Sequence, residues 1–407
     1  MTISTLPASI AAFHVDASRA DCPRGFVASG LACGLRKSGK PDLALFLAPA
    51  GASVAGVFTK NLLCAAPVTL SKRHLEASAG VGRAVLINSG CANAATGAEG
   101  DRSAADMAAI AAAAIGCAPE ETLIASTGVI GPQLEVGKIR AAMPALADEA
   151  SPNGLDRAAD AILTTDTCPK AAQAHVTVDG RTFHVAGVAK GSGMIHPNMA
   201  TMLGVVMTDA AVAPEALQRM LTVATNRTFN RVSVDGDTST NDCVYAMASG
   251  EAGDFPEQVV ADAIERVCRE LALKIVRDGE GAKKVIHVSV SDALTEDEAE
   301  QVARTVGSSL LVRTAIAGGD PNWGRIAAAV GRSGAPLDMN QVVIRVGGLS
   351  IFADGAPTGV ARERLAPAFA GPDVHIDISL GRGQADATYL TCDLTEGYIQ
   401  INAYYTT

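Results

Sequence analysis

The run KGSGMIHPNMATML, residues 190–203, constrains the fold of this chain more than any other feature of its sequence. Two glycines and a proline interrupt the run, so it forms neither a long helix nor a central strand. A β-like segment precedes it at 182–188, and an apolar segment follows it at 202–208. The middle of the chain therefore predicts a bent loop between two buried strands.

The loop contains a threonine, Thr201, that follows a small residue, Ala200, and lies downstream of Lys190. Threonine is a weak nucleophile without a base, but at the start of a chain its own α-amine, with a pKa of about 7.7–8.0, serves as one. That chemistry requires the loop to cut its own Ala200–Thr201 bond. Attack of the Thr201 hydroxyl on the Ala200 carbonyl, an N→O acyl shift and hydrolysis would do so. An ordinary connecting loop has the same composition, so the pattern alone leaves both interpretations open.

A second candidate element, STGVIG at 126–131, lies at the end of a predicted buried strand. An acyl-transfer nucleophile needs hydrogen-bond donors for the developing oxyanion. Thr127 offers a hydroxyl, and Gly128 leaves its backbone N–H sterically open. A plain strand-to-helix turn uses the same residue types, so this alternative also stays open.

Helix-like and strand-like patterns alternate along the rest of the chain. Apolar residues recur at helical spacing over 256–277, and we expect Asp278-Gly279 to cap this helix. Thr295 and Glu298 have the spacing of a capping box. Further helices are expected at about 102–115 and 214–224, and strands at 84–88, 122–126, 284–290, 342–346, 349–352, 375–380, 387–393 and 398–403. The mixture predicts a layered α/β or α+β fold and not a doubly wound parallel sheet. We expect residues 1–24 to form a tail or an edge strand.

Three motifs that bind ligands in other proteins are incomplete here. GLRKSGK at 34–40 matches the start of a phosphate-binding loop, but Pro41 stands where a Ser or Thr would bind magnesium. The segment 235–241 alternates oxygen ligands as a calcium loop does, but it lacks the glycine at the sixth position, and Ala246 stands where the final acidic residue belongs. We expect a turn rich in side-chain hydrogen bonds instead. The histidines show no metal-binding spacing, and His196 is expected to be a loop residue.

Composition excludes several classes of protein. The net charge is −10 and aromatic residues make up 4%, with no basic cluster among them, which argues against a nucleic-acid partner. No stretch reaches the ~18 apolar residues of a membrane-spanning helix, and the N-terminus lacks the pattern of a secretory signal. The nine cysteines are scattered without a C-x-x-C pair, so neither a disulfide framework nor a zinc site is expected. We expect a cytoplasmic enzyme that acts on small metabolites.

Seven motifs, in this order, resemble those of one family. They are STGVIG (126–131), TTDTCPK (164–170), KGSGMIHPNMATML (190–203), FNRVSVDGDTSTND (229–242), DGEGAKK (278–284), GGDPNWGRI (318–326) and CDLTEGYIQINAYYTT (392–407). The chain resembles the ornithine acetyltransferases, the bifunctional glutamate N-acetyltransferases of arginine biosynthesis. The resemblance extends from about Gly25 to the last residue, and Gly397 and Ala403 depart from the usual tail pattern.

The resemblance implies self-cleavage between Ala200 and Thr201. The products would be an α chain (1–200) and a β chain (201–407) that stay associated, in an α2β2 or larger assembly. The implied fold is a layered αββα-type sandwich of mixed sheets. The implied reaction is ping-pong transfer of an acetyl group from N2-acetyl-L-ornithine to L-glutamate through acetyl-Thr201, with acetyl-CoA as a further donor in some members. It needs no cofactor and no metal.

The resemblance also assigns site residues by position. Thr127 and Gly128 correspond to the oxyanion hole, and the implied substrate contacts are Thr167, Lys190, Thr201, Glu280, Asn402 and Thr407. The chemistry of these types agrees with that assignment, because a lysine pairs with the α-carboxylate that ornithine and glutamate share. A carboxylate such as Glu280 suits an ammonium group of ornithine.

Two other functions remain open at this stage. An N-terminal-nucleophile amidase or aminopeptidase would use the same nucleophile with water in place of the acceptor amine. A non-catalytic metabolite-binding protein would never cut its own chain.

Overall fold

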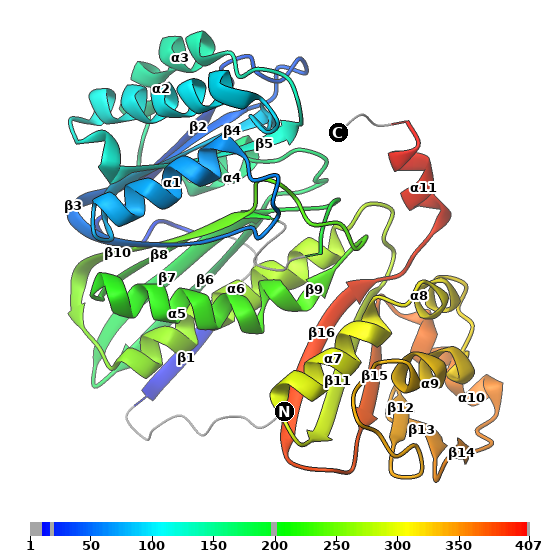
Figure 1. The fold of residues 1–407 in the computed structure, drawn as a ribbon. Coiled ribbons are helices and arrows are strands. Elements are labelled where there is room, and N and C mark those ends of the chain that lie inside the picture. Colours follow the sequence, from blue (N-terminus) through cyan, green and yellow to red (C-terminus); the bar gives the residue numbers. More distant parts are fainter. Residues whose placement is uncertain (1–9, 17–19, 197–201, 405–407) are drawn as a thin grey trace. The chain divides into compact units, whose positions relative to one another are not determined.

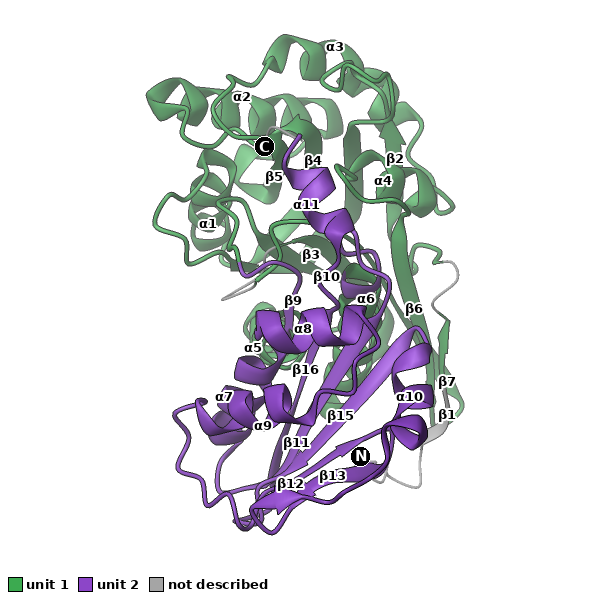
Figure 2. Cartoon of the chain, turned by 90° about the vertical axis from the view of Figure 1, so that its right-hand side faces the viewer, with its two compact units in different colours: residues 1–230, 237–275, 407 green, residues 231–236, 276–406 purple. Residues whose placement is uncertain are grey.

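The computed structural model describes residues 10–16, 20–196 and 202–404 (Figure 1). They divide into two compact units (Figure 2). The first unit contains the described residues up to 230 and 237–275, and the second contains 231–236 and those from 276 onward. The described residues on both sides of the expected cleavage site at 200/201 belong to the first unit.

The first unit is built on one mixed sheet of nine strands, in the order β1-β6-β7-β8-β10-β3-β4-β5, with β2 paired to β3. The strands are β1 (Ile10–Asp16), β2 (Val27–Leu31), β3 (Leu43–Phe58), β4 (Val81–Cys91), β5 (Thr122–Val129), β6 (Lys170–Val178), β7 (Arg181–Lys190), β8 (Leu203–Ala211) and β10 (Cys243–Asp254). Its helices are α1 (Ala66–Ala77), α2 (Gly97–Ile115), α3 (Val136–Asp148), α4 (Leu155–Ala161), α5 (Pro214–Arg227) and α6 (Glu257–Arg277).

The long strand β3 folds this sheet into two layers. Its first part pairs with β4, its last part pairs with β10, and the register shifts between Leu47 and Ala52, where Gly51 has a φ of 79°. Side chains of both layers share one buried core, and the Tyr245 hydroxyl of β10 donates to the Ile124 carbonyl of β5 at 2.7 Å. The two halves of one bent sheet therefore face each other.

Helices cover the outer face of each layer. Buried leucines of β3 and β4 pack with Met107 of α2 and Met143 of α3 on one side. On the other side, Gly187 of β7 lies against Val267 and Leu271 of α6. Figure 1 shows α1–α3 over the first layer and α5 and α6 over the second. The predicted αββα layering is present within this unit.

The second unit has its own seven-stranded sheet, in the order β14-β13-β12-β15-β11-β16-β9. The strands are β9 (Val232–Ser233), β11 (Val285–Ala293), β12 (Val343–Val346), β13 (Leu349–Ala353), β14 (Ala356–Pro357), β15 (Asp373–Ser379) and β16 (Ala385–Cys392). Its helices are α7 (Glu296–Gly307), α8 (Leu310–Ala317), α9 (Trp323–Gly331), α10 (Arg362–Ala370) and α11 (Glu396–Asn402). The sheet contains parallel and antiparallel pairs, so the predicted class, mixed α/β with mixed sheets, is confirmed.

Most predicted elements are found, with shifted ends. The helix predicted at 102–115 begins earlier, at Gly97, and the edge strand predicted near the N-terminus is β1. The capping box of α7 is half formed: Thr295 Oγ1 accepts from the Glu298 N–H at 3.2 Å. The Glu298 carboxylate accepts from the N–H of Leu294 in place of the N–H of Thr295.

Two predictions are wrong. Residues 398–402 belong to α11 and not to a strand, because Thr395 Oγ1 accepts from the Gly397 N–H at 3.1 Å and so caps a helix, which Ala403 ends. Ile399 and Ile401, whose alternation indicated a strand, are exposed. Gly279 is not a left-handed cap of α6 either, since the positive φ, 72°, occurs at Gly281.

Within the residues that the structure describes, every helix is too short or too polar to cross a lipid bilayer.

Candidate active site

The end of β5 carries the two residues expected to bind an oxyanion. Thr127 is buried, and the β4–β5 ladder is irregular beside it, since Cys91 pairs with both Thr127 and Val129. Irregularities of this kind re-aim side chains at strand ends and are common next to active sites. The local backbone therefore departs from a regular strand at Thr127 and Gly128, the residues that the sequence predicts to bind an oxyanion.

Position 128 admits only glycine. Gly128 has a φ of 133°, a conformation that residues with a side chain rarely adopt. A Cβ atom there would lie 2.4 Å from the Gly90 carbonyl carbon and 2.5 Å from the Cys91 nitrogen. The glycine is required by this close approach of two backbones.

Buried amides fix the strand ends around Thr127. Ser126 Oγ donates to Asn88 Oδ1 at 2.6 Å, and the Asn88 amide donates to the Cys91 carbonyl at 2.9 Å. From the other layer, the Asn241 amide donates to the carbonyls of Ser126 and Ala92 at 2.9 and 2.6 Å. Asn241 belongs to the acidic segment that resembled a calcium loop, and the prediction of a hydrogen-bonded turn there is confirmed.

Lys190, the last residue of β7, reaches Thr127 from the opposite layer. Its side chain is buried, and its Nζ donates to Thr127 Oγ1 at 3.2 Å. In the β7–β8 ladder Lys190 pairs with Leu203, which follows the loop that joins the two strands. The lysine, the threonine and both ends of that loop thus lie at the same end of the folded sheet.

A buried carboxylate lies beside this lysine. Asp166 Oδ1 accepts from Lys170 Nζ at 2.6 Å and from the N–H of Gly191 at 2.7 Å, and neither side chain of the Asp166–Lys170 pair is exposed. Burial opposes ionisation of Asp166, but the charges of Lys190 and Lys170 outweigh it and lower the pKa of Asp166 to about 2. The carboxylate is therefore fully ionised at neutral pH.

The described residues on both sides of the loop are anchored at this end of the sheet. Ile195 forms a bridge with Thr238, whose hydroxyl donates to the His196 carbonyl at 2.8 Å. On the far side, the Met202 carbonyl accepts from the Cys243 N–H at 3.1 Å. Ala200 and Thr201, the expected cleavage site and nucleophile, lie outside the described residues.

The remaining predicted contacts fall in different places. Thr167 is exposed and follows Asp166 in the first unit. Glu280 and Asn402 meet within the second unit, where the Asn402 amide donates to Glu280 Oε2 at 2.8 Å. Thr407 lies outside the described residues.

The loop that carries Glu280 is tied to the C-terminal segment. Thr395 Oγ1 donates to the Gly281 carbonyl at 2.6 Å, and Asp393 Oδ1 accepts from the N–H groups of Lys283 and Lys284 at 2.8 and 2.9 Å. A Cβ on Gly281 would lie 2.3 Å from the Tyr398 nitrogen. These contacts set the position of the Glu280 backbone.

Sequence reasoning missed several residues of this arrangement. Asp166 and Lys170 lie within TTDTCPK, but only Thr167 of that motif was expected to have a role, because the four-residue spacing indicates an ion pair only in a helix and this segment is not helical. Asn88 carries no sequence signal, because an asparagine among strand residues is ordinary, and Asn241 lies within the 229–242 motif without an expected role of its own.

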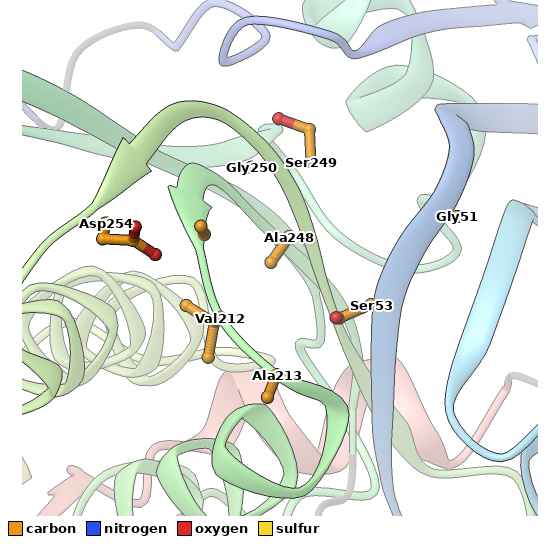
Figure 3. A pocket seen from close by; sticks show the side chains of 9 residues that line it. Gly51, Ser53, Val212, Ala213, Ala248, Ser249, Gly250 and Asp254 are labelled. Atoms are coloured by element: carbon orange, nitrogen blue, oxygen red, sulfur yellow. The ribbon is translucent and has the colours of Figure 1, made fainter.

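A separate cavity of about 310 Å³ lies elsewhere in the first unit, near the start of α5 (Figure 3). Its lining residues are Gly51, Ser53, Ala211, Val212, Ala213, Ala248, Ser249, Gly250 and Asp254. None of the predicted site residues lines it. Among the described residues, no three His, Cys, Asp or Glu side chains gather closely enough to hold a metal ion.

Comparison with known proteins identifies the family. The family model of ArgJ matches residues 27–407. The chain belongs to the ArgJ family. The arginine biosynthesis bifunctional protein ArgJ of Nitratidesulfovibrio vulgaris (strain Hildenborough) is 48% identical over 388 residues, which cover 94% of this chain and 98% of that protein. The resemblance drawn from the motifs is confirmed, and with it the enzyme class, an acetyltransferase of arginine biosynthesis.

Further ArgJ relatives agree. The protein of the same name from Chlorobaculum tepidum is 47% identical over 388 residues, covering 94% of this chain and 96% of that protein. Among solved structures, an ornithine acetyltransferase from Mycobacterium tuberculosis, described as complexed with ornithine, is 37% identical. It covers 46% of this chain and 100% of its own, with a TM-score of 0.41.

Proposed function

We propose that this ArgJ protein transfers the acetyl group of N2-acetyl-L-ornithine to L-glutamate through acetyl-Thr201, after cutting its own chain between Ala200 and Thr201. The observation that carries the proposal is the 3.2 Å contact of Lys190 with Thr127 at the end of the sheet where the 191–202 loop begins and ends. Family membership supports it independently.

Self-cleavage starts with attack of the Thr201 hydroxyl on the Ala200 carbonyl. The bond from that carbonyl carbon to the Thr201 nitrogen breaks, an ester to the Thr201 oxygen forms, and the nitrogen takes a proton. Water then hydrolyses the ester, which leaves Thr201 with a free α-amine. That amine is the base that a threonine nucleophile needs near neutral pH.

Acetyl transfer repeats this chemistry on substrate. The Thr201 hydroxyl attacks the acetyl carbonyl of acetyl-ornithine, its proton passes to the departing ornithine nitrogen, and an acetyl ester remains. The amine of glutamate then attacks the ester and receives the acetyl group, and the proton returns to Thr201. Thr127 and the Gly128 N–H stabilise the oxyanion in both halves, where such donors are typically worth a factor of about 10²–10³ in rate.

The residues that the motifs assign by position are the proposed substrate contacts. In the first unit, Lys190 binds the α-carboxylate that donor and acceptor share, beside Thr167. In the second unit, Glu280, held by Asn402, binds an ammonium group of ornithine. We also propose that Thr407 contacts substrate and that acetyl-CoA is a second acetyl donor. The cleaved chains assemble as α2β2 or a larger complex in the cytoplasm.

Mass spectrometry and a transfer assay test the proposal together. Denaturing intact-mass analysis is expected to show two fragments, the second beginning at Thr201 and gaining one acetyl group when acetyl-ornithine is supplied alone. With glutamate added, N-acetylglutamate and ornithine should appear in equal amounts. Thr201→Ala should give one intact, inactive chain.

Other outcomes would redirect the assignment. Free acetate without acetyl-glutamate would identify an amidase in which water is the acceptor. An uncleaved wild-type chain with full transfer activity would overturn the threonine mechanism.

A further inference from the structure

The direction of the Lys190–Thr127 hydrogen bond is fixed by chemistry. A lysine ammonium has donors and no acceptor, so Thr127 Oγ1 must accept. The threonine hydroxyl has a single hydrogen, which therefore points away from Lys190. Within the described part of the chain, Thr127 Oγ1 has no other hydrogen-bond partner. Lys190 thus leaves the Thr127 O–H ready to donate to an oxyanion.

Asp166 contacts the backbone next to Lys190. Its Oδ1 accepts the N–H of Gly191, the peptide immediately after Lys190, at 2.7 Å, and the charge of Lys190 acts on the same carboxylate. Oδ2 accepts the Thr164 N–H at 3.1 Å, so the carboxylate is held at both oxygens.

Lys170 completes the arrangement. It is fully buried, bonds to Asp166 at 2.6 Å, and pairs in the β6–β7 ladder one residue away from Lys190, opposite Ala189. One carboxylate therefore compensates two buried lysines on neighbouring strands. Removing it takes a negative charge away from two buried ammonium groups, which is costly in a buried site.

We propose that Asp166 is a positioning residue of the reaction: together with Lys170 it holds Lys190 against Thr127, and Lys190 in turn orients the Thr127 hydroxyl as an oxyanion donor. The proposal rests on the proposed function. Asp166 and Lys170 contact other protein residues and not the substrate. Lys190 gains an orienting role in addition to its role in binding substrate.

A double-mutant cycle tests this chain of contacts. Thr127→Val, Asp166→Asn and the double variant are compared for kcat, KM and the rate of self-cleavage. Thr127→Val is expected to lower kcat by about 100-fold, in the range of a lost oxyanion donor. Asp166→Asn should lower kcat about tenfold or more alone, and hardly further in the Thr127→Val background, because residues acting through one contact are not additive. Asp148→Asn, an exposed aspartate of the same unit, is the control.

A second variant separates positioning from charge balance. Asp166→Asn combined with Lys170→Met removes both members of the buried pair, so it should fold as judged by its melting temperature. The proposal predicts that its kcat stays low. Recovery of kcat in this variant would show that Asp166 only neutralises Lys170 and would overturn the proposal.

The remaining outcomes are also decisive. Additive effects in the cycle would show that Asp166 acts on general stability. A raised KM at unchanged kcat would show that it acts on substrate binding through its neighbour Thr167. Either result would contradict the proposal. If Asp166→Asn is cleaved too slowly for transfer to be measured, the same cycle is evaluated on the cleavage rate, and additive effects on that rate contradict the proposal. If Thr127→Val leaves both rates unchanged, the oxyanion role in the proposed function fails, which is a distinguishable result.

Discussion

The amide of Asn402 donates a hydrogen bond of 2.8 Å to the carboxylate of Glu280, across 122 positions of sequence. The last helix of the described chain thus orients an acidic side chain in the loop after α6. Because Glu280 is buried, its direction is set by this bond and by the backbone contacts of its loop. We expect the pair to determine how tightly an ammonium group is bound.

Asn402→Ala should weaken binding of the amine substrate and leave the chemical step nearly intact. Hydrogen bonds to charged groups contribute about 1.5–3 kcal/mol, so KM for acetyl-ornithine should rise by tenfold or more. Steady-state kinetics with acetyl-ornithine and glutamate measure this effect. Asn340→Ala, an exposed asparagine of the same unit, is the matched control and should change neither constant. A fall in kcat at constant KM would show that Asn402 does not act through binding.

Two neighbouring glycines separate steric from conformational effects. Gly128→Ala places a Cβ 2.4 Å from backbone, whereas Gly131, with a φ of 104°, has nothing within 4 Å of that position. Gly131→Ala should cost only the strain of a positive φ, on the order of 1 kcal/mol, and keep its activity. Gly128→Ala should displace the strand end and lower the transfer rate by about 100-fold or more. Urea unfolding and transfer rates measure both, and equal behaviour of the two variants would contradict the assignment.

His184 predicts acid sensitivity of the first unit. Burial, with the neighbouring charge of His175, lowers the pKa of His184 to about 4. The unfolded chain, with a pKa near 6.5, binds a proton before the folded chain does, so stability is lost as the pH falls from about 6.5 to about 4. The loss from this residue is on the order of 3 kcal/mol.

His184→Gln should therefore flatten the dependence of unfolding free energy on pH in that window. Unfolding in urea at several pH values measures the slope. His14→Gln, which changes an exposed histidine on the edge strand, should leave the slope as it is. An unchanged slope in His184→Gln would place the acid sensitivity elsewhere.

Local patterns in the sequence were sufficient for the regular elements. Helix α6 follows from the spacing of Val260, Ile264, Val267 and Leu271, all of which are buried. The same reasoning failed for α11, because its alternating isoleucines indicate a strand and its helix depends on the capping by Thr395. Apolar periodicity identifies the buried face of a helix, and an exposed terminal helix has no buried face to produce it.

The architecture of the site could not be derived from local patterns. The bend of β3 passes through Pro49 and Gly51, which indicate a turn between two elements and not one strand of sixteen residues shared by two layers. Without that bend, β5 and β7 lie five strands apart in the sheet order, and no contact between Thr127 and Lys190 is expected. The motifs supplied the residue identities, and the folding of the sheet supplied their proximity.

The strand order has a consequence for a chain whose backbone is interrupted. Strands β8 and β10 lie between β7 and β3, so any break between Gly191 and Met202 yields two pieces that are interleaved in one sheet. To separate, the pieces would have to give up the ladder between Val185–Lys190 and Leu203–Thr208 and that between Cys243–Ala248 and Ser53–Phe58, along with the apolar interior they share. The two pieces therefore stay associated without a peptide bond between them, and a purification tag on either piece should recover both.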